Sequence, residues 1–137
     1  MFVGVILFIS LQTSPIKNLK MITIDGTEIT SEHLNGKLTL INFWATDCPG
    51  CINEMPALIQ TYKQYKNKGL EVIAVAMYYD PPSRVISYAK NNELPFPVVL
   101  DSNKEIMNKF NNIKLTPTSV ILDQNGYIIN TIIGEIN

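Results

Sequence analysis

Two cysteines, Cys48 and Cys51, are the residues whose type and spacing most clearly predict chemistry. They lie in the segment 46–51, TDCPGC, which follows a strongly apolar run and precedes a stretch with apolar residues at helical spacing. This pattern predicts that a buried strand ends and a helix begins at Cys48. Because N–H groups at a helix start lack intrahelical partners and the helix dipole is positive there, a thiolate is stabilised. Such a position lowers the pKa of a thiol from about 8.5 to roughly 3.5–7.5, so Cys48 is the predicted nucleophile.

The neighbours of Cys48 favour exchange with another chain. Cys51 lies one helical turn further along, so its thiol can attack a mixed disulfide formed on Cys48 and release the partner reduced. Pro49 suits a helix start, and Gly50 keeps bulk away from the sulfurs. Asp47 acts in the opposite direction because its negative charge raises the pKa of Cys48, but we expect the helix to have the larger influence. The alternative is a static disulfide or a pair of inert buried thiols.

A second candidate site residue is Pro117, which stands with Thr116 directly before a β-prone run. Proline at the start of a strand costs no ladder hydrogen bond and is a natural place for a cis peptide bond. If the Thr116-Pro117 bond is cis, the backbone of Thr116 is free to pair with an extended substrate strand beside Cys48. The alternative is a trans proline that simply begins the strand.

The composition argues against several other classes of protein. The chain has 137 residues, which suits one domain. Hydrophobic residues make up 46% and charged residues 17%, as in globular rather than disordered proteins. The 11 basic residues oppose 12 acidic ones and are scattered, so no nucleic-acid partner is expected. With two cysteines and one histidine, His33, which we interpret as a surface turn residue, neither a metal nor another cofactor is predicted.

The N-terminal segment 1–15 differs from the rest of the chain. Residues 2–11 are almost purely apolar, and no charge appears before Lys17. They are too few to cross a bilayer of about 30 Å as a helix, but they match the hydrophobic region of a secretory signal, although its basic leader is missing. We expect a short signal or membrane anchor ahead of a domain at 16–137, which would place that domain outside the cytoplasm. The alternative is an apolar segment that docks on the domain.

The remaining pattern predicts an α/β fold around a central strand at 38–45, which is apolar along nearly its whole length and therefore buried on both faces. An amphipathic helix is expected from the cysteines to about residue 68, with a kink at Pro56. An Asp-Gly turn at 25–26 predicts an N-terminal hairpin. Crossover helices make the sheet partly parallel, with an antiparallel closing hairpin. The other expected strands are 70–76, 96–100, 118–122 and 127–133, and the other helices are one opened by residues 80–82 and one at 104–110.

Together these residues resemble the thioredoxin superfamily, and more narrowly the TlpA/ResA-like thiol-disulfide oxidoreductases, over roughly residues 22–134. The resemblance implies a thioredoxin-like fold with a mixed central sheet flanked by helices, the N-terminal hairpin, an extra helix within 78–94 and a cis Thr116-Pro117 bond. The matching motifs are LNGK at 34–37, NFWAT at 42–46, the cysteine segment at 48–51, EMP at 54–56, FPVVLD at 96–101, and TPT at 116–118 followed by DQNG at 123–126.

The resemblance also implies thiol-disulfide exchange outside the cytoplasm. Such proteins commonly reduce disulfides in partner proteins, cytochrome c apoproteins among them, and receive electrons from a membrane reductase. The candidate catalytic residues are then Cys48, Cys51 and Pro117. The candidate substrate-binding residues are Trp44, Pro49, Gly50 and Thr116.

Two departures from the family pattern concern the site. Asn42 stands where thioredoxin carries a buried acid, so that proton acceptor is absent. Asp80, which corresponds roughly to a Glu near the cysteines of ResA-like proteins, is the candidate catalytic substitute and would accept the Cys51 proton. The alternative is that Asp80 caps the helix that follows it. Asp47 also replaces a common Trp, which bears on partner choice and reduction potential.

A third departure is at the end of the sequence, where only residues 134–137 follow the last expected strand and the family's final helix is missing. Isoleucines on both sides of that strand predict burial on both sides. We expect the open face to be covered by residues 2–11, by a second subunit or by residues beyond this sequence.

Two rival functions are less well supported by the sequence. A peroxiredoxin-type peroxidase resembles a pattern with Thr three residues before the reactive Cys and a nearby Arg, but Ala45 occupies that position and Arg84 is the only arginine. A copper-delivery module related to the Sco proteins typically has a C-x-x-x-C spacing and a distant His, whereas this chain has the shorter spacing and only His33. A non-catalytic scaffold is a third option, disfavoured because both cysteines are present. Reductases and oxidases share the motif, so the sequence leaves the direction of exchange open.

Overall fold

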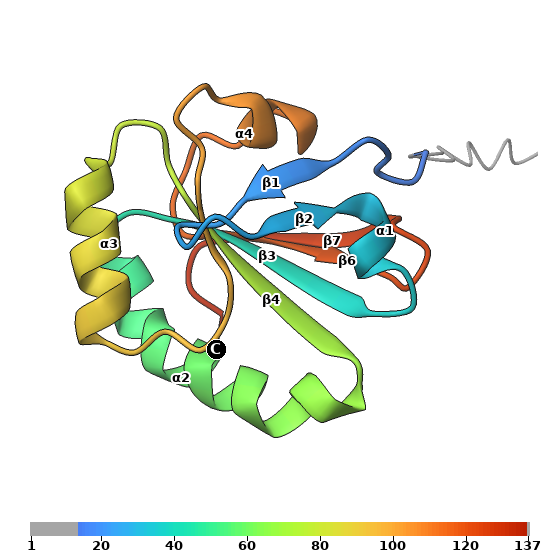
Figure 1. The fold of residues 1–137 in the computed structure, drawn as a ribbon, viewed down its shortest axis with the longest axis horizontal. Helices are drawn as coiled ribbons and strands as arrows, with labels where there is room; N and C mark the ends of the chain where they lie inside the picture. The colour runs from blue at the N-terminus through green and yellow to red at the C-terminus, as the bar shows by residue number, and fades with distance from the viewer. Residues whose placement is uncertain (1–13, 137) are drawn as a thin grey trace, which may run out of the picture.

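A mixed five-stranded sheet in the order β5-β4-β3-β6-β7 forms the centre of the computed structural model, which describes residues 14–136 (Figure 1). β3 (Leu38–Trp44) is the central strand and pairs in parallel with β4 (Leu70–Ala76). On its other side β3 pairs antiparallel with β6 (Thr118–Leu122). β5 (Val98–Leu100) extends the sheet in parallel beyond β4, and β7 (Ile128–Ile133) closes it antiparallel to β6. The predicted partly parallel sheet with a closing hairpin is confirmed.

Helices cover both faces of this sheet. α2 (Pro49–Tyr65) and η1 (Lys66–Lys68) connect β3 to β4, and α3 (Pro82–Asn91) connects β4 to β5. Figure 1 shows α2 and α3 on one side of the sheet and α4 (Glu105–Lys109) on the other. The fold is therefore the expected α/β class with an extra helix, α3, in the centre of the chain.

Two apolar cores lie on opposite faces of the sheet, because alternate residues of a strand point to opposite sides. On β4, Val72 and Ala74 pack with residues of α2 and α3, whereas Ile73 and Val75 pack with residues of α4 and the N-terminal hairpin. All four side chains are fully buried. The continuous apolar runs of β3 and β4 thus follow from burial on both faces.

The predicted N-terminal hairpin consists of β1 (Lys20–Ile22) and β2 (Glu28–Thr30), and it is followed by α1 (Ser31–Leu34). Its turn contains Gly26 at φ 86°, a value that favours glycine. Ile24 donates its backbone N–H to the carbonyl of Val98 at 2.9 Å, so the hairpin covers the β5 edge of the sheet. β1 ends at Ile22, after which the chain turns toward β5.

α2 continues through Pro56 as one helix from Pro49 to Tyr65, so the expected kink does not end or divide it. None of the helices within residues 14–136 has the length and hydrophobicity that a membrane span requires. Residues 1–13, which hold most of the predicted signal or anchor, lie outside the described residues. From residue 16 onward the chain packs on the domain, where the N–H of Ile16 donates to the carbonyl of Gly126 at 2.8 Å.

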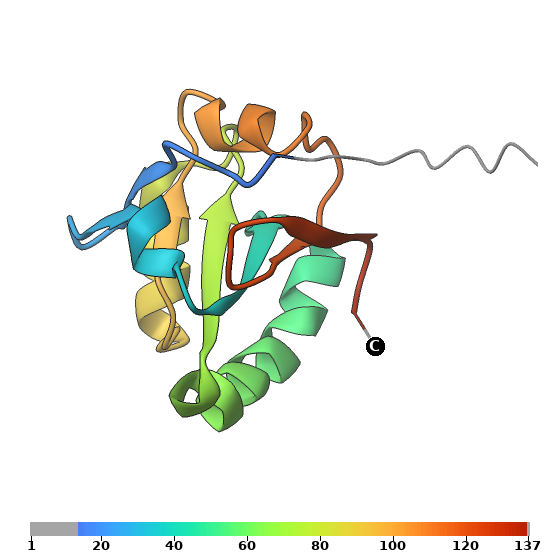
Figure 2. The same ribbon diagram turned by 90° about the vertical axis from the view of Figure 1, so that its right-hand side faces the viewer.

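The chain after β7 turns back toward α2 (Figure 2). The N–H of Ile136 donates to the Glu54 carboxylate at 2.7 Å, which fixes this segment to the helix. No helix follows β7 within the described part of the chain. On β7, Ile128 packs against the core, whereas Ile129 and Ile133 are 57% and 67% exposed. One side of this edge strand is therefore open to solvent in the described residues.

Candidate active site

Cys48 and Cys51 form a disulfide at the junction of β3 and α2, with their Cα atoms 5.3 Å apart. Cys48 is the N-cap residue of α2 and Pro49 is the first residue of the helix. The N–H of Cys51 donates to Cys48 Sγ at 3.2 Å. An N–H group that has no partner within the helix is thus directed at this sulfur, as the placement of the motif predicted.

The two cysteines differ in their exposure. Cys48 is half-buried, whereas Cys51 is 1% exposed and packs with Trp44 and Met55 in the core between the sheet and α2. Pro49 beside Cys48 is exposed. Cys48 is therefore the more accessible residue of the pair, and Cys51 is enclosed in the core.

The Thr116-Pro117 peptide bond is cis and lies next to the cysteine motif, although the two are far apart in sequence. A Cβ placed on Gly50 would lie 3.3 Å from Cδ of Pro117 and 3.0 Å from a carboxylate oxygen of Glu135. Gly50 therefore lets three chain segments meet at the start of α2. Thr116 is half-buried, and within the described residues its backbone makes no hydrogen bond to another backbone group.

Trp44, expected to contact substrate, is instead a core residue. It is 0% exposed, and its ring lies 5.2 Å from that of Tyr88 on α3. The cause is the burial of β3 on both faces, which places this last strand residue beneath α2 and α3. Trp44 supports the start of α2 from within and does not reach a partner.

Asp80 is buried, and both of its carboxylate oxygens bind Thr46. One accepts the Thr46 N–H and the other accepts the Thr46 hydroxyl, each at 2.7 Å. The N-cap residue of α3 is Pro81, and no side chain caps that helix. The alternative interpretation of Asp80 as a helix cap is therefore wrong, and the carboxylate instead holds the loop two residues before Cys48.

A buried carboxylate that the sequence analysis did not assign to the site, that of Glu54, lies against Asn42. The side-chain amide of Asn42 donates to Glu54 at 2.8 Å and to the hydroxyl of Ser119 at 3.1 Å. Glu54 lies three residues after Cys51 and four before Leu58, on the face of α2 that is buried. A charged residue at that spacing on an apolar helix face was the signal that could have revealed it.

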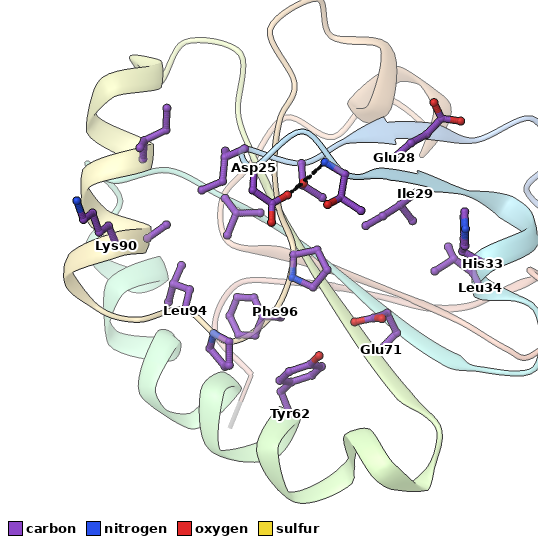
Figure 3. Close-up of a pocket in the computed structure, with 18 of the residues that line it drawn as sticks. Asp25, Glu28, Ile29, His33, Leu34, Tyr62, Glu71, Lys90, Leu94 and Phe96 are labelled. Carbon is purple, nitrogen blue, oxygen red and sulfur yellow. Dashed lines mark hydrogen bonds between the residues drawn. The ribbon is translucent and has the colours of Figure 1, made fainter.

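A cavity of about 660 Å³ lies elsewhere, between the N-terminal hairpin, α3 and the segment 94–98 (Figure 3). Tyr62 and Glu71 point into it, and burial raises the pKa of both side chains. Neither cysteine lines this cavity, and nor do Pro117 or Asp80. The predicted chemistry thus lies at the surface of the molecule, beside the end of β3. Within residues 14–136 no cluster of three or more His, Cys, Asp or Glu side chains could hold a metal ion.

The fold and the cysteine pair define a thioredoxin-like protein. The chain belongs to the Redoxin family, which matches residues 11–137. It is 34% identical to the thiol-disulfide oxidoreductase ResA of a Bacillus cereus strain over 118 residues, which are 86% of this chain and 67% of ResA.

Solved structures agree with this assignment. A thioredoxin-like protein from Neisseria meningitidis superposes with a TM-score of 0.84 at 39% identity, over 90% of this chain and 83% of that one. StoA from Bacillus subtilis superposes with a TM-score of 0.75 at 32% identity, over 86% and 88% of the two chains. The protein is therefore a thiol-disulfide oxidoreductase of the ResA/StoA type with a Cys48-Cys51 pair.

Proposed function

We propose that this oxidoreductase works as a reductase of disulfides in extracytoplasmic proteins, with Cys48 as the attacking residue. The single observation that carries the proposal is the arrangement of the cysteines. Cys48 is reachable at the N-terminus of α2 and accepts an N–H from Cys51, whereas Cys51 is buried directly behind it. This order favours attack by Cys48 and resolution by Cys51.

The reaction balances in two exchanges. The thiolate of Cys48 attacks one sulfur of the partner disulfide, which forms a mixed disulfide and releases the first partner thiolate, to be protonated. The thiol of Cys51 then loses its proton and attacks Cys48 Sγ, which releases the second partner thiolate. Two electrons pass to the partner, and the Cys48-Cys51 disulfide forms. Before the protein can act again, the Cys48-Cys51 disulfide must receive two electrons. We propose that a membrane electron donor supplies them.

The residues beside Cys48 suit the binding of a polypeptide. The backbone of Thr116 is available to pair with an extended segment of the partner, and Pro117 holds that backbone beside the start of α2. Pro49 is exposed and leaves room for the partner, and the missing side chain of Gly50 lets Pro117 approach the start of α2. We assign Asp80 as the group that accepts the Cys51 proton, since it is a buried carboxylate fixed to the loop before Cys48.

The cellular context of the proposal is supported by the N-terminal sequence and by the relatives. Residues 2–11 have the hydrophobicity of a secretory signal or anchor, and we propose that they direct the domain at 16–137 out of the cytoplasm. We propose that its partners include cytochrome c apoproteins, as the resemblance to the TlpA/ResA-like proteins implies. A fusion of residues 1–15 to a reporter enzyme that is active only outside the cytoplasm tests this part, and an inactive reporter contradicts it.

Trapping of mixed disulfides tests the proposed roles of the cysteines. Reduced Cys51→Ser protein mixed with insulin should accumulate a covalent complex that dithiothreitol dissolves, because the resolving thiol is absent. Reduced Cys48→Ser protein should form almost none, since its remaining thiol is buried. Equal trapping by the two variants would contradict the assignment.

The reduction potential of the Cys48-Cys51 pair tests the direction of exchange. A potential well below the glutathione range favours the reductase, and one far above it favours an oxidase.

A further inference from the structure

Two exposed tyrosines, Tyr78 and Tyr79, lie in the turn that follows β4, at the same edge of the sheet as Cys48. Their side chains are 42% and 47% exposed, although the last five residues of β4 and Met77 between that strand and Tyr78 are buried. β3 and β4 are parallel, and Trp44 is the register partner of Ala76. The loops that leave these strands, one leading to Cys48 and the other carrying the tyrosines, therefore begin side by side (Figure 1).

The tyrosine turn is fixed to the loop before Cys48 at both of its ends. At the first end, the N–H of Met77 donates to the carbonyl of Trp44 at 3.0 Å. At the second end, the Asp80 carboxylate binds the N–H and the hydroxyl of Thr46, each at 2.7 Å. The tyrosines are thus held by residues that lie within four positions of Cys48.

The two rings are also ordered by contacts of their own. Their centroids are 5.3 Å apart and their planes meet at 82°, an edge-to-face arrangement. The ammonium group of Lys104, in the loop before α4, lies 4.2 Å from the centroid of the Tyr78 ring. Two separate loops therefore build this exposed aromatic surface, which we call the Tyr78-Tyr79 platform.

The sheet order places the platform opposite the cis-proline loop. β4 and β6 are the two neighbours of β3, so the platform lies on one side of the Cys48 loop and Thr116-Pro117 on the other. A chain that pairs with Thr116, presents its disulfide to Cys48 and continues in the same direction across the strand ends reaches the tyrosines. Ordered tyrosines are favoured contact residues because they offer a large amphipathic area at a small entropic cost.

We propose that the Tyr78-Tyr79 platform binds a large apolar side chain, aromatic or aliphatic, that flanks the attacked cysteine in the partner polypeptide. The inference rests on the proposed function, in which Cys48 attacks a protein disulfide, and it adds a selection among disulfides by their neighbouring residues. The platform takes no part in the exchange of sulfur bonds. Small disulfides do not extend beyond Cys48, so the platform should not affect the rate at which they are reduced.

Single-turnover reduction of matched peptides tests the platform. Two disulfide-bonded peptides are compared, one with Phe and Leu beside the cysteines and one with Ser at the same positions, together with a small aromatic disulfide reagent. In the Tyr78→Ala/Tyr79→Ala variant, the second-order rate constant for the Phe/Leu peptide should fall about tenfold. The rate constants for the Ser peptide and for the small reagent should change less than about twofold, and the Tyr78→Phe/Tyr79→Phe variant should retain the wild-type preference.

Tyr65 supplies the matched control. It is 42% exposed and has the ammonium group of Lys68 at 5.6 Å from its ring, but it lies at the far end of α2 from Cys48. Tyr65→Ala should leave all three rate constants unchanged. The platform would be overturned if the alanine variant reduced the Phe/Leu peptide as fast as the wild type does. It would also be overturned if the variant lost the same rate on both peptides. Either result would leave the proposed function intact. Failure of wild-type protein to reduce either peptide would overturn both.

Discussion

At Cys48 one sulfur atom has both a structural and a chemical role. It accepts the N–H of Cys51 and so caps the N-terminus of α2. The N-cap position is usually occupied by Ser, Thr, Asp or Asn. An ionised acceptor makes a stronger hydrogen bond than a neutral one, so the helix start favours the thiolate over the thiol. Asp47, the neighbouring acid, is exposed, and solvent therefore screens its charge.

The role of Asp80 can be separated from its contact with Thr46 by two substitutions. Asp80→Asn removes the proposed proton acceptor but keeps the size of the side chain. We expect release of the partner from the mixed disulfide to slow about 10- to 100-fold, with a changed pH profile. Thr46→Val removes only the hydroxyl that donates a hydrogen bond to Asp80. The Asp80 carboxylate is kept, so the pH profile should be retained.

Stopped-flow kinetics of the second exchange, followed from pH 5 to 9, measures both variants. If Asp80→Asn and Thr46→Val slow release equally and leave the pH profile unchanged, Asp80 acts only as the residue that positions Thr46. The assignment of a proton acceptor would then be wrong, even though the loop contact remains.

Between elements, Glu54 joins α2 to β3 and to the segment after β7. Its two oxygens accept from the Asn42 side chain and from the N–H of Ile136. Both donors are left without this acceptor in Glu54→Ala, so we expect the free energy of unfolding to fall by about 2–4 kcal/mol. Glu54→Gln keeps one acceptor oxygen and should lose less. Urea unfolding of the oxidised protein provides the measurement, and a loss below about 0.5 kcal/mol in Glu54→Ala would contradict this account.

The elements themselves could be predicted where local patterns are strong. The apolar run of β3, the helical spacing of α2 and the Asp-Gly turn of the hairpin each carry their own signal, and all three elements form as expected. The position of Cys48 could be predicted in the same way, because it lies where the apolar run of β3 ends and the helical spacing of α2 begins. These features depend on residues that are close together in sequence.

Features that depend on distant contacts could not be predicted in this way. The contact of Glu54 with Asn42, and that of Asp80 with Thr46, join residues 12 and 34 positions apart. The prediction for Trp44 was wrong for a different reason. The sequence predicts burial of β3 on both faces, and a substrate contact by its last residue, Trp44, is incompatible with that burial. In the structure Trp44 is fully buried.

Across the whole molecule, the reactive edge of the sheet is separate from the cavity that holds Glu71. Burial raises the pKa of Glu71, while the N–H of Val72 and the charge of Lys37 lower it. A raised pKa in the folded state means that Glu71 stabilises the fold most below its unfolded pKa, and that this contribution is lost as the pH rises through the folded pKa. Glu71→Gln should therefore gain stability relative to wild type between pH 4 and pH 7.

Thermal unfolding across that pH range measures the effect, which should stay below about 1 kcal/mol because the carboxyl is not fully buried. Glu28→Gln is the control for the loss of one negative charge, since Glu28 pairs with Lys20 at the surface. A difference between Glu71→Gln and wild type that is constant with pH, or that falls as the pH rises, would contradict the prediction.

The alkylation of reduced protein by iodoacetamide as a function of pH tests the central claim most directly. Mass spectrometry after digestion separates the modification of Cys48 from that of Cys51. We predict that Cys48 reacts with an apparent pKa at least about one unit below the ordinary thiol value of roughly 8.5, and that Cys51 stays unmodified until the protein is unfolded. Titration of Cys48 at or above the ordinary value, or modification of Cys51 at the same rate, would show that the start of α2 does not generate the nucleophile.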